Sequence, residues 1–185
     1  MKKTLQKRPV NSSELLDGCT ALLTRIYRSR GVSDVSELDR QLSAMLPYDN
    51  LMDIQKACER MTQSIQHQEK VIIIGDYDTD GATSTALMVR MLKAFGLQQV
   101  DFLVPNRFEY GYGLSPKIVE VASKKSPQLL ITVDNGIVSF DGVNLANSLG
   151  IDVIITDHHL PGASLPNACA VVNPNRLDDP FPSKN

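Results

Sequence analysis

Three aspartates on alternate residues, Asp76, Asp78 and Asp80, have the type and spacing that could bind a metal ion. Two carboxylates 4 Å apart repel each other by about 4 kcal/mol at an effective dielectric constant of roughly 20. A divalent cation between them would keep all three carboxylates ionised. A solvated acidic turn is the simpler alternative, but it is more usual with one or two aspartates than with three. The pattern therefore favours a metal site.

Two other kinds of site begin with a similar acidic pattern. The D-x-D-x-D-G spacing matches the first six positions of an EF-hand calcium loop, but that loop needs a preceding helix and a glutamate at its twelfth position. This chain has an apolar run before the aspartates and Leu87 at the twelfth position. A phosphatase with an aspartyl nucleophile would use two of the aspartates and leave the third unexplained. Both alternatives account for less of the pattern than a metal site does.

The aspartates follow four branched apolar residues at 71–74, a run without polar alternation. Such a run predicts a strand that is buried on both faces, as in the interior of a parallel sheet. Gly81 is expected to let the backbone turn, and Thr83 or Ser84 is expected to cap a following helix that ends at Gly96. We therefore predict a strand–loop–helix unit with the carboxylates in its loop.

Two further apolar runs also end in residues that could bind a metal. Residues 129–133 precede Asp134, and residues 153–155 precede the Asp-His-His sequence at 157–159. The carboxyl ends of parallel strands meet at one edge of a sheet, where neighbouring strands lie about 4.8 Å apart, so these groups could converge. Oxygen donors with one or two imidazoles suit Mn²⁺ or Mg²⁺, and a pair of such ions is a common design for phosphoester hydrolysis.

Each of these two motifs also has a simpler explanation when it is taken alone. Asn135-Gly136 favours positive φ, so Asp134 could belong to an ordinary turn. Asp157 could be a capping residue beside two hydrogen-bonded imidazoles. The three acidic motifs together, each after an equivalent strand, favour one shared metal site.

The remaining pattern predicts an α/β fold, in which a parallel β-sheet flanked by helices follows a helical N-terminal lead-in. We expect the lead-in to cover residues 1–68 and the α/β domain to cover residues 69–185. Within that domain, residues 173–185 are polar and rich in proline and show no core pattern. The other predicted strands cover residues 102–104 and 170–172. The other predicted helices begin at or near Ser12 or Ser13, Ser33, Asn50, Ser115 and Val143.

The composition describes an ordinary globular protein. The chain has 185 residues, 42% of them hydrophobic, and a net charge of −2, which by itself predicts neither a nucleic-acid partner nor a membrane partner. The three cysteines lie far apart and lack C-x-x-C spacing, so we expect reduced thiols in a cytoplasmic protein. No run approaches about 18 apolar residues, so neither membrane insertion nor export is expected.

Five stretches of the chain carry a resemblance to a known family. The Asp-His-His sequence, with GDYDTDG at 75–81 and TVDNG at 132–136, resembles the DHH phosphoesterase superfamily. The order of GDYDTDGATSTAL, VPNRFEYGYGLS, TVDNGI, TDHHLPG and VNPN is similar to that of the bacterial RecJ exonucleases. The similarity extends from the N-terminal helices almost to the last residue.

This resemblance implies a 5′→3′ exonuclease that is specific for single-stranded DNA, acts in recombination and repair, and uses a pair of Mn²⁺ or Mg²⁺ ions. It implies that Asp134 bridges the ions, that His159 faces the scissile phosphate and that Asp157 orients the site. The sequence of the loop at 105–115 is equally consistent with a glycine-rich lid that packs on itself, but the resemblance favours Arg107 and Tyr112 as contacts to the substrate. The metal ligands that the resemblance implies are Asp76, Asp78, Asp80, Asp134 and His158.

The family also has parts that this chain lacks. A further metal-binding aspartate, a second α/β domain and an OB-like domain follow these motifs in the family, whereas this chain ends at Asn185. We therefore expect an N-terminal segment of such a nuclease that binds metal weakly and degrades DNA little by itself. Two alternatives stay open: a DHH phosphoesterase for short oligonucleotides or small phosphorylated molecules, and a non-catalytic metal-binding module that acts through a partner. The resemblance also suggests a single-strand-binding protein or a helicase as a partner.

Overall fold

The computed structural model describes residues 4–10, 12 and 14–182, with only the backbone described at residues 107 and 108. The chain forms two compact units, Met1–Pro47 and Tyr48–Asn185, which we describe separately. The second unit contains the sheet. Among the described residues, no helix combines the length and the apolar character needed to cross a bilayer.

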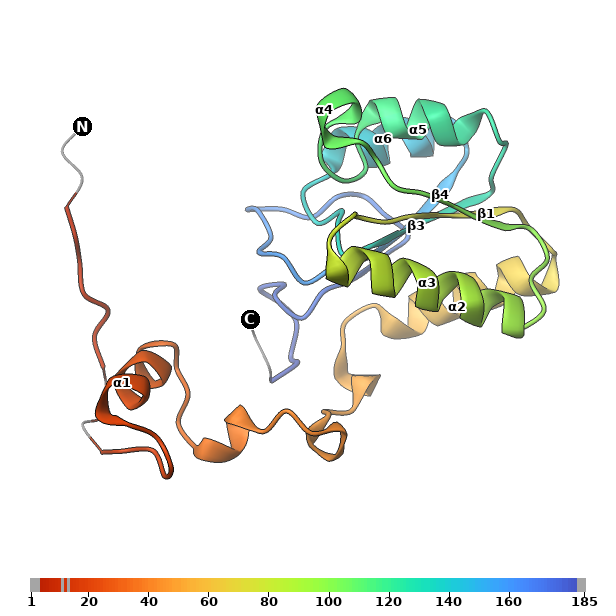
Figure 1. The fold of residues 1–185 in the computed structure, drawn as a ribbon. Coiled ribbons are helices and arrows are strands. Elements are labelled where there is room, and N and C mark those ends of the chain that lie inside the picture. The colour runs from red at the N-terminus through yellow and green to blue at the C-terminus, as the bar shows by residue number, and fades with distance from the viewer. Residues whose placement is uncertain (1–3, 11, 13, 183–185) are drawn as a thin grey trace. The chain divides into compact units, whose positions relative to one another are not determined.

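A five-stranded sheet forms the centre of the second unit (Figure 1). Its strands are β1 (Val71–Ile74), β2 (Val100–Leu103), β3 (Leu129–Val133), β4 (Asp152–Thr156) and β5 (Ala170–Val172). Their order is β2-β1-β3-β4-β5, and every neighbouring pair is parallel. This confirms the predicted parallel α/β sheet. The strand predicted at 102–104 begins two residues earlier than expected, at Val100.

Helices cover both faces of this sheet (Figure 1). On one face, α2 (Ile54–Gln66) and α3 (Thr79–Ala94) pack on side chains such as Val71, Ile73 and Ile131. On the other face, α5 (Pro116–Ser123) and α6 (Phe140–Ser148) pack on Ile72 and its neighbours. Because successive side chains of a strand point to opposite faces, the unbroken apolar run of β1 serves both cores at once. A short helix, α4 (Arg107–Tyr110), follows β2.

The helix starts were predicted with mixed success. Ser115 caps α5 as expected, since its Oγ accepts the N–H of Ile118 at 3.4 Å. In α3 the predicted caps are wrong, because Asp78 is the N-cap and its Oδ1 accepts the N–H of Gly81 at 3.1 Å. Thr83 and Ser84 lie inside the helix, where their hydroxyls donate to main-chain carbonyls three or four residues earlier. A carboxylate at the N-cap also interacts favourably with the helix dipole.

The division between the units lies at Pro47, which differs from the predicted boundary at residue 68. The reason is α2, which begins at Ile54 rather than near Asn50 and packs on the sheet. Ala57 on this helix is buried, and Met61 packs against the same core cluster. The helix therefore belongs to the α/β unit and not to the lead-in.

The first unit contains less helix than predicted. Its helix α1 (Ala21–Ser29) begins at the cap Thr20, so the predicted start near Ser12 is wrong, while Ser13 lies outside the described residues. The helix predicted from Ser33 is replaced by two single 3₁₀ turns, η1 (Val35–Leu38) and η2 (Leu42–Ala44). A capping box between Asp34 and Glu37 stabilises the N-terminus of η1. The apolar residues that follow η1, such as Leu42, remain exposed. Exposed apolar residues give a helix no packing energy to extend it.

The described part of the segment after β5 contributes buried residues, although its sequence shows no core pattern. Four polar residues of this segment are buried: Asn173, Asn175, Arg176 and Asp179. Arg176 donates to Asp53 Oδ2 at 2.9 Å and to the carbonyl of Val171 at 2.7 Å, and Asp179 accepts the N–H of Met52 at 2.9 Å. The segment is therefore fastened to the start of α2 by charge-assisted hydrogen bonds, which no apolar pattern could have revealed.

Candidate metal centre

Asp76 is held at the end of β1 by the close approach of α3. Its carboxylate is buried, and its Oδ1 accepts the N–H of Tyr77 at 2.8 Å. A Cβ on Gly81 would lie 2.5 Å from the Cβ of Asp76, a distance that real side chains do not adopt. Gly81 is therefore required for helix packing. The prediction that it lets the backbone turn is wrong, because it lies inside α3.

Asp134 follows β3 in the left-handed backbone region, with a φ of 63°. Such a φ is uncommon outside glycine, although aspartate and asparagine tolerate it. The next residue, Asn135, is fully buried, and its amide donates to the carbonyl of Ile74 at 3.0 Å and to that of Val133 at 2.9 Å. Asn135 thus ties the ends of β1 and β3 together, a contribution that its interpretation as a simple turn residue missed.

Asp157 organises the turn after β4. Its Oδ1 accepts the N–H groups of His158 at 2.7 Å and His159 at 3.1 Å, and its Oδ2 accepts the N–H of Ile137 at 2.9 Å. The same Oδ1 lies 2.7 Å from Nδ1 of the His159 ring. Because a carboxylate only accepts, this contact assigns the Nδ1 proton to His159 and turns its Nε2 to the opposite side of the ring.

The predicted side chains converge at the carboxyl edge of the sheet. Ligand atoms of Asp76, Asp78 and Asp134 all lie within 4.8 Å of one another, and so do those of Asp134, His158 and His159. Asp134 is common to both groups, and its Oδ1 lies 3.0 Å from Nε2 of His158.

Asp80 lies at the margin of this cluster. It occupies the first turn of α3, and its carboxylate is mostly exposed. Its Oδ2 is 4.0 Å from Nε2 of His158, and it belongs to neither of the two close groups. Four of the five predicted ligands thus belong to the two close groups, and the fifth lies beside them.

The electrostatics of the cluster suit a cation. Burial and the neighbouring charge of Asp78 raise the pKa of Asp134, although His158 partly opposes this effect. The hydrogen bond to Asp157 raises the pKa of His159, and the charge of Asp134 acts in the same direction. Neighbouring negative charge contributes to both shifts, and a divalent ion would offset that charge. Carboxylate oxygens with imidazole nitrogens form a donor set that fits Mn²⁺ or Mg²⁺.

A cavity of about 440 Å³ opens beside His159. Tyr112 lines it, donates its hydroxyl to the carbonyl of Asp134 at 3.4 Å, and meets the His159 ring edge-on at a centroid distance of 6.1 Å. The predicted substrate contact Tyr112 therefore lies next to the cluster. The side chain of Arg107, the other predicted contact, lies outside the described part of the chain. The other lining residues are Asp78, Gly136, Ile137, Val138, Asp157 and Leu160.

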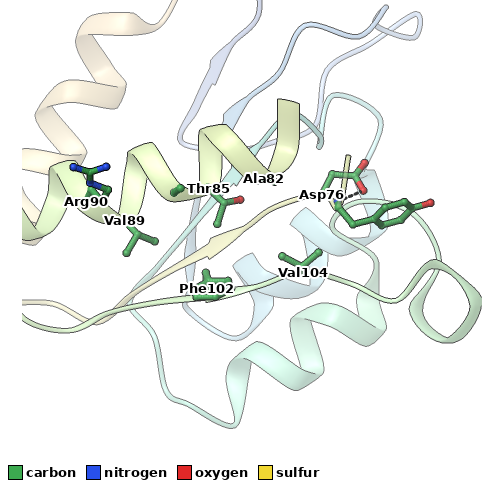
Figure 2. Close-up of a pocket in the computed structure, with 9 residues that line it drawn as sticks. Asp76, Ala82, Thr85, Val89, Arg90, Phe102 and Val104 are labelled. Carbon is green, nitrogen blue, oxygen red and sulfur yellow. Dashed lines mark hydrogen bonds between the residues drawn. The ribbon is translucent and has the colours of Figure 1, made fainter. Parts of the chain in front are cut away.

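A second cavity, of about 350 Å³, shares Asp76 with the cluster (Figure 2). It lies between α3 and the edge strand β2, with Asp76 at one end and Arg90 at the other. Its walls are mainly apolar, and Phe102 is about half exposed there, at 52%. Asp76 is the one carboxylate among its lining residues, so this cavity cannot hold a metal site of its own.

Comparison with known proteins identifies the family. The model of the DHH family, N-terminal domain, matches residues 70–181, which include every residue of the cluster. The chain belongs to the DHH family. The Asp-His-His turn that gives the family its name is thus the turn that Asp157 organises in this structure.

Within the DHH family, this chain resembles the single-stranded-DNA-specific exonucleases RecJ. It is 50% identical to the RecJ of Dickeya dadantii over 180 residues, and 48% identical to that of Escherichia coli K12 over 188 residues. These alignments cover 97% and 100% of this chain but 31% and 33% of the relatives. A crystal structure of exonuclease RecJ bound to manganese matches 73% of this chain and 34% of its own with a TM-score of 0.66 and 33% identity. The predicted resemblance is confirmed, and the chain spans about a third of the length of these relatives.

Proposed function

We propose that this chain carries the metal centre of a nuclease that degrades single-stranded DNA from the 5′ end and releases 5′-mononucleotides. The observation that supports this best is the pair of ligand groups that share Asp134. The names of the relatives support the substrate, and the manganese-bound structure supports Mn²⁺, with Mg²⁺ as the alternative hard cation.

We propose the ligand set that the cluster offers. Asp134 belongs to both groups, which supports it as a ligand shared between two ions, and Asp80 would add a carboxylate from the first turn of α3. When bound, two such ions would activate a water molecule and stabilise the charge that develops on the phosphate. The full proposed set is Asp76, Asp78, Asp80, Asp134 and His158.

His159 is proposed to act on the scissile phosphate. Its Nδ1 is engaged by Asp157, so its Nε2 is the ring nitrogen that remains for the substrate. His159 lines the cavity of about 440 Å³ and carries a raised pKa, which favours a protonated ring that could stabilise phosphate charge or donate a proton. Asp157 holds the ring and its tautomer in place, as carboxylates do for many catalytic histidines.

Tyr112 and Arg107 are proposed as substrate contacts. Tyr112 lines the same cavity, where its ring could stack on an unpaired base, a contact worth about 1–3 kcal/mol that tolerates any sequence. Arg107 could pair with a phosphate through its guanidinium. A cytoplasmic location is a proposal that rests on the widely separated cysteines. A single-strand-binding protein or a helicase as partner is a proposal that rests on the family resemblance.

The test measures Mn²⁺ binding by calorimetry for the chain and for Asp134→Ala, together with the release of nucleotides from 5′-labelled single-stranded DNA. We expect weak binding that Asp134→Ala abolishes. Asp141→Ala, which removes an exposed carboxylate from α6, is the matched control and should bind like the parent. Absence of Mn²⁺ binding, or equal binding by Asp134→Ala, would contradict the proposal.

The choice of substrate separates the remaining alternatives. Single-stranded DNA is compared with dinucleotides and with small phosphate esters under the same Mn²⁺ concentration. Faster hydrolysis of the short substrates would favour a phosphoesterase for short oligonucleotides or small molecules. Metal binding without hydrolysis of any substrate would identify a formed but incomplete site, which agrees both with a nuclease segment and with a module that acts through a partner.

A further inference from the structure

Two asparagines that follow β5 hold the main chain of the Asp-His-His turn. The side-chain amide of Asn173 donates to the carbonyl of His159 at 2.9 Å, and that of Asn175 donates to the carbonyl of His158. Asn173 is fully buried and Asn175 is 8% exposed. Each histidine of the turn is therefore matched by one asparagine from the neighbouring segment.

The orientation of the Asn173 amide is set by a second hydrogen bond. Its Oδ1 accepts the N–H of Asn175 at 2.7 Å, so its Nδ2 must face His159. The bond between Oδ1 and the N–H of Asn175 is sufficient to form a local Asx turn. The donation to His159 is a separate hydrogen bond, and it joins this segment to the Asp-His-His turn.

The two sides of the turn complement each other. Asp157 accepts the N–H groups of both histidines, while Asn173 and Asn175 donate to both carbonyls. All four main-chain polar groups of His158 and His159 are thus engaged. With the backbone held in this way, the ring of His158 is directed at Asp134 and that of His159 at Asp157.

We propose that Asn173 and Asn175 are positioning residues of the metal centre, which act through the main-chain carbonyls of His159 and His158. This inference rests on the proposed function, because the importance of the ring directions depends on it. Outer residues that orient metal ligands typically change metal affinity by 10–100-fold when they are removed. Since His158 is a proposed ligand and His159 is not, the two asparagines have different expected effects.

Asn175→Ala tests the effect on the ligand. We expect the Mn²⁺ affinity of the chain, measured by calorimetry, to fall by about 10-fold. Asn147→Ala is the matched control, because the Asn147 amide donates to the carbonyl of Asn167 at 2.8 Å in an exposed place. The control should keep the parent affinity, and equal affinities for the parent and Asn175→Ala would overturn this half of the proposal.

Asn173→Ser tests the effect on His159 without removing the local turn. A serine hydroxyl can still accept the N–H of residue 175, but it lacks the amide that donates to His159. In the metal-free chain, ¹H–¹⁵N spectra of the imidazoles report which ring nitrogen carries the proton. At a pH where the ring is neutral, we expect His159 to carry its proton uniformly at Nδ1 in the parent and to be a mixture of the two tautomers in Asn173→Ser. A spectrum identical to that of the parent would show that Asn173 serves only the turn.

The two measurements separate this inference from the proposed function. If the parent chain fails to bind Mn²⁺ but the His159 spectrum changes in Asn173→Ser, the proposed function fails and the positioning by Asn173 stands. If the parent binds Mn²⁺ but neither variant differs from the Asn147→Ala control, the positioning fails and the proposed function stands. Circular dichroism of each variant establishes that the compared chains are folded.

Discussion

Asp134 combines an unusual backbone conformation with a central place in the proposed metal site. Its backbone has a positive φ, the residue is 8% exposed, and its pKa is raised by burial and by Asp78. Without a bound ion, the fold therefore holds a carboxylate in an unfavourable environment. Such a residue lowers the stability of the metal-free chain and raises the benefit of binding a cation.

Asp134→Asn is expected to separate these two effects. Asparagine tolerates a positive φ and removes the charge, so the metal-free variant should unfold about 2–4 °C above the parent, which corresponds to about 1 kcal/mol for a chain of this size. Addition of Mn²⁺ should raise the Tm of the parent but not that of the variant. Thermal unfolding by circular dichroism with and without Mn²⁺ measures both values. An equal Mn²⁺-induced shift in the two proteins would show that Asp134 does not bind the ion.

At the scale of elements, the contact between α3 and β1 sets the position of Asp76. A Cβ on Gly81 would lie 2.5 Å from the Asp76 Cβ and 2.7 Å from its main-chain carbon. Main-chain atoms cannot move aside as the end of a flexible side chain can. The helix and the strand end must therefore separate if Gly81 is enlarged.

Gly81→Ala should consequently weaken the site, although alanine is a better helix former by about 1 kcal/mol. We expect Mn²⁺ affinity to fall at least about 10-fold, and the free energy of unfolding to fall by about 1–3 kcal/mol from the forced separation. Calorimetry and urea unfolding measure the two effects. Gly162→Ala is the control, since a Cβ there has only one neighbour within 4 Å, at 3.9 Å. A variant with parent affinity would mean that α3 does not position Asp76.

An ion-pair network joins α2 to the amino-terminal end of β4, where Asp152 lies. Arg60 on α2 donates to Glu69 Oε2 at 2.7 Å and to Asp152 Oδ2 at 2.6 Å, and Ser64 donates to Glu69 at 2.8 Å. Burial raises the pKa of Glu69, but the hydrogen bonds from Arg60 and Ser64 outweigh it and leave the pKa below its usual value. Ionised Glu69 therefore stabilises the folded chain.

The sign of this effect predicts a dependence on pH. A carboxyl whose folded pKa is lowered contributes stability above its unfolded pKa of about 4.3, and loses that contribution as the pH falls through the folded value. Glu69→Gln should be less stable than the parent by about 1–2 kcal/mol at pH 7, and the difference should shrink below about pH 4. Urea unfolding at both pH values tests this, with the exposed Glu120→Gln as the control. A difference that does not change with pH would exclude the charge of Glu69 as its cause.

For the whole molecule, the division at Pro47 places the sheet, both core clusters and every proposed ligand in one unit. The segment after β5 closes this unit through Arg176, which binds Asp53 near the start of α2. The unit thus contains both hydrophobic cores and the Arg176–Asp53 ion pair that holds its last segment.

A chain that begins at Tyr48 should therefore fold independently. We expect its Tm to lie within about 4 °C of that of the full chain, equivalent to roughly 1 kcal/mol, and its Mn²⁺ affinity to be unchanged within about twofold. Thermal unfolding and calorimetry on the two chains make the comparison. Arg176→Ala in the shorter chain serves as the destabilised reference, with an expected loss of about 2–3 kcal/mol. A shorter chain that does not fold cooperatively would show that residues 1–47 support the α/β unit.

The strands and the carboxylates at their ends were predictable because burial on both faces leaves an unbroken apolar run. Residues 71–74 and 129–133 form β1 and β3 with the predicted bounds, and α5 begins at its predicted cap. The predictions failed where apolar residues stay exposed, as at Leu42, and where a cap depends on the local geometry of a loop, as at Asp78.

The sequence by itself determined the parallel α/β fold, the acidic ends of three strands and the family, because these depend on local patterns of burial and on motifs that are continuous in the chain. Only the tertiary structure decided that Asp134 belongs to both ligand groups, that α2 belongs to the α/β unit and that Asn173 and Asn175 hold the Asp-His-His turn. These features depend on contacts between residues that are not neighbours in the chain. Asn173 and His159 are separated by 14 residues, and Arg176 and Asp53, which join the last segment to the start of α2, by 123. A hydrogen bond between such residues leaves no periodic pattern in the sequence, because it depends on the register in which distant segments meet.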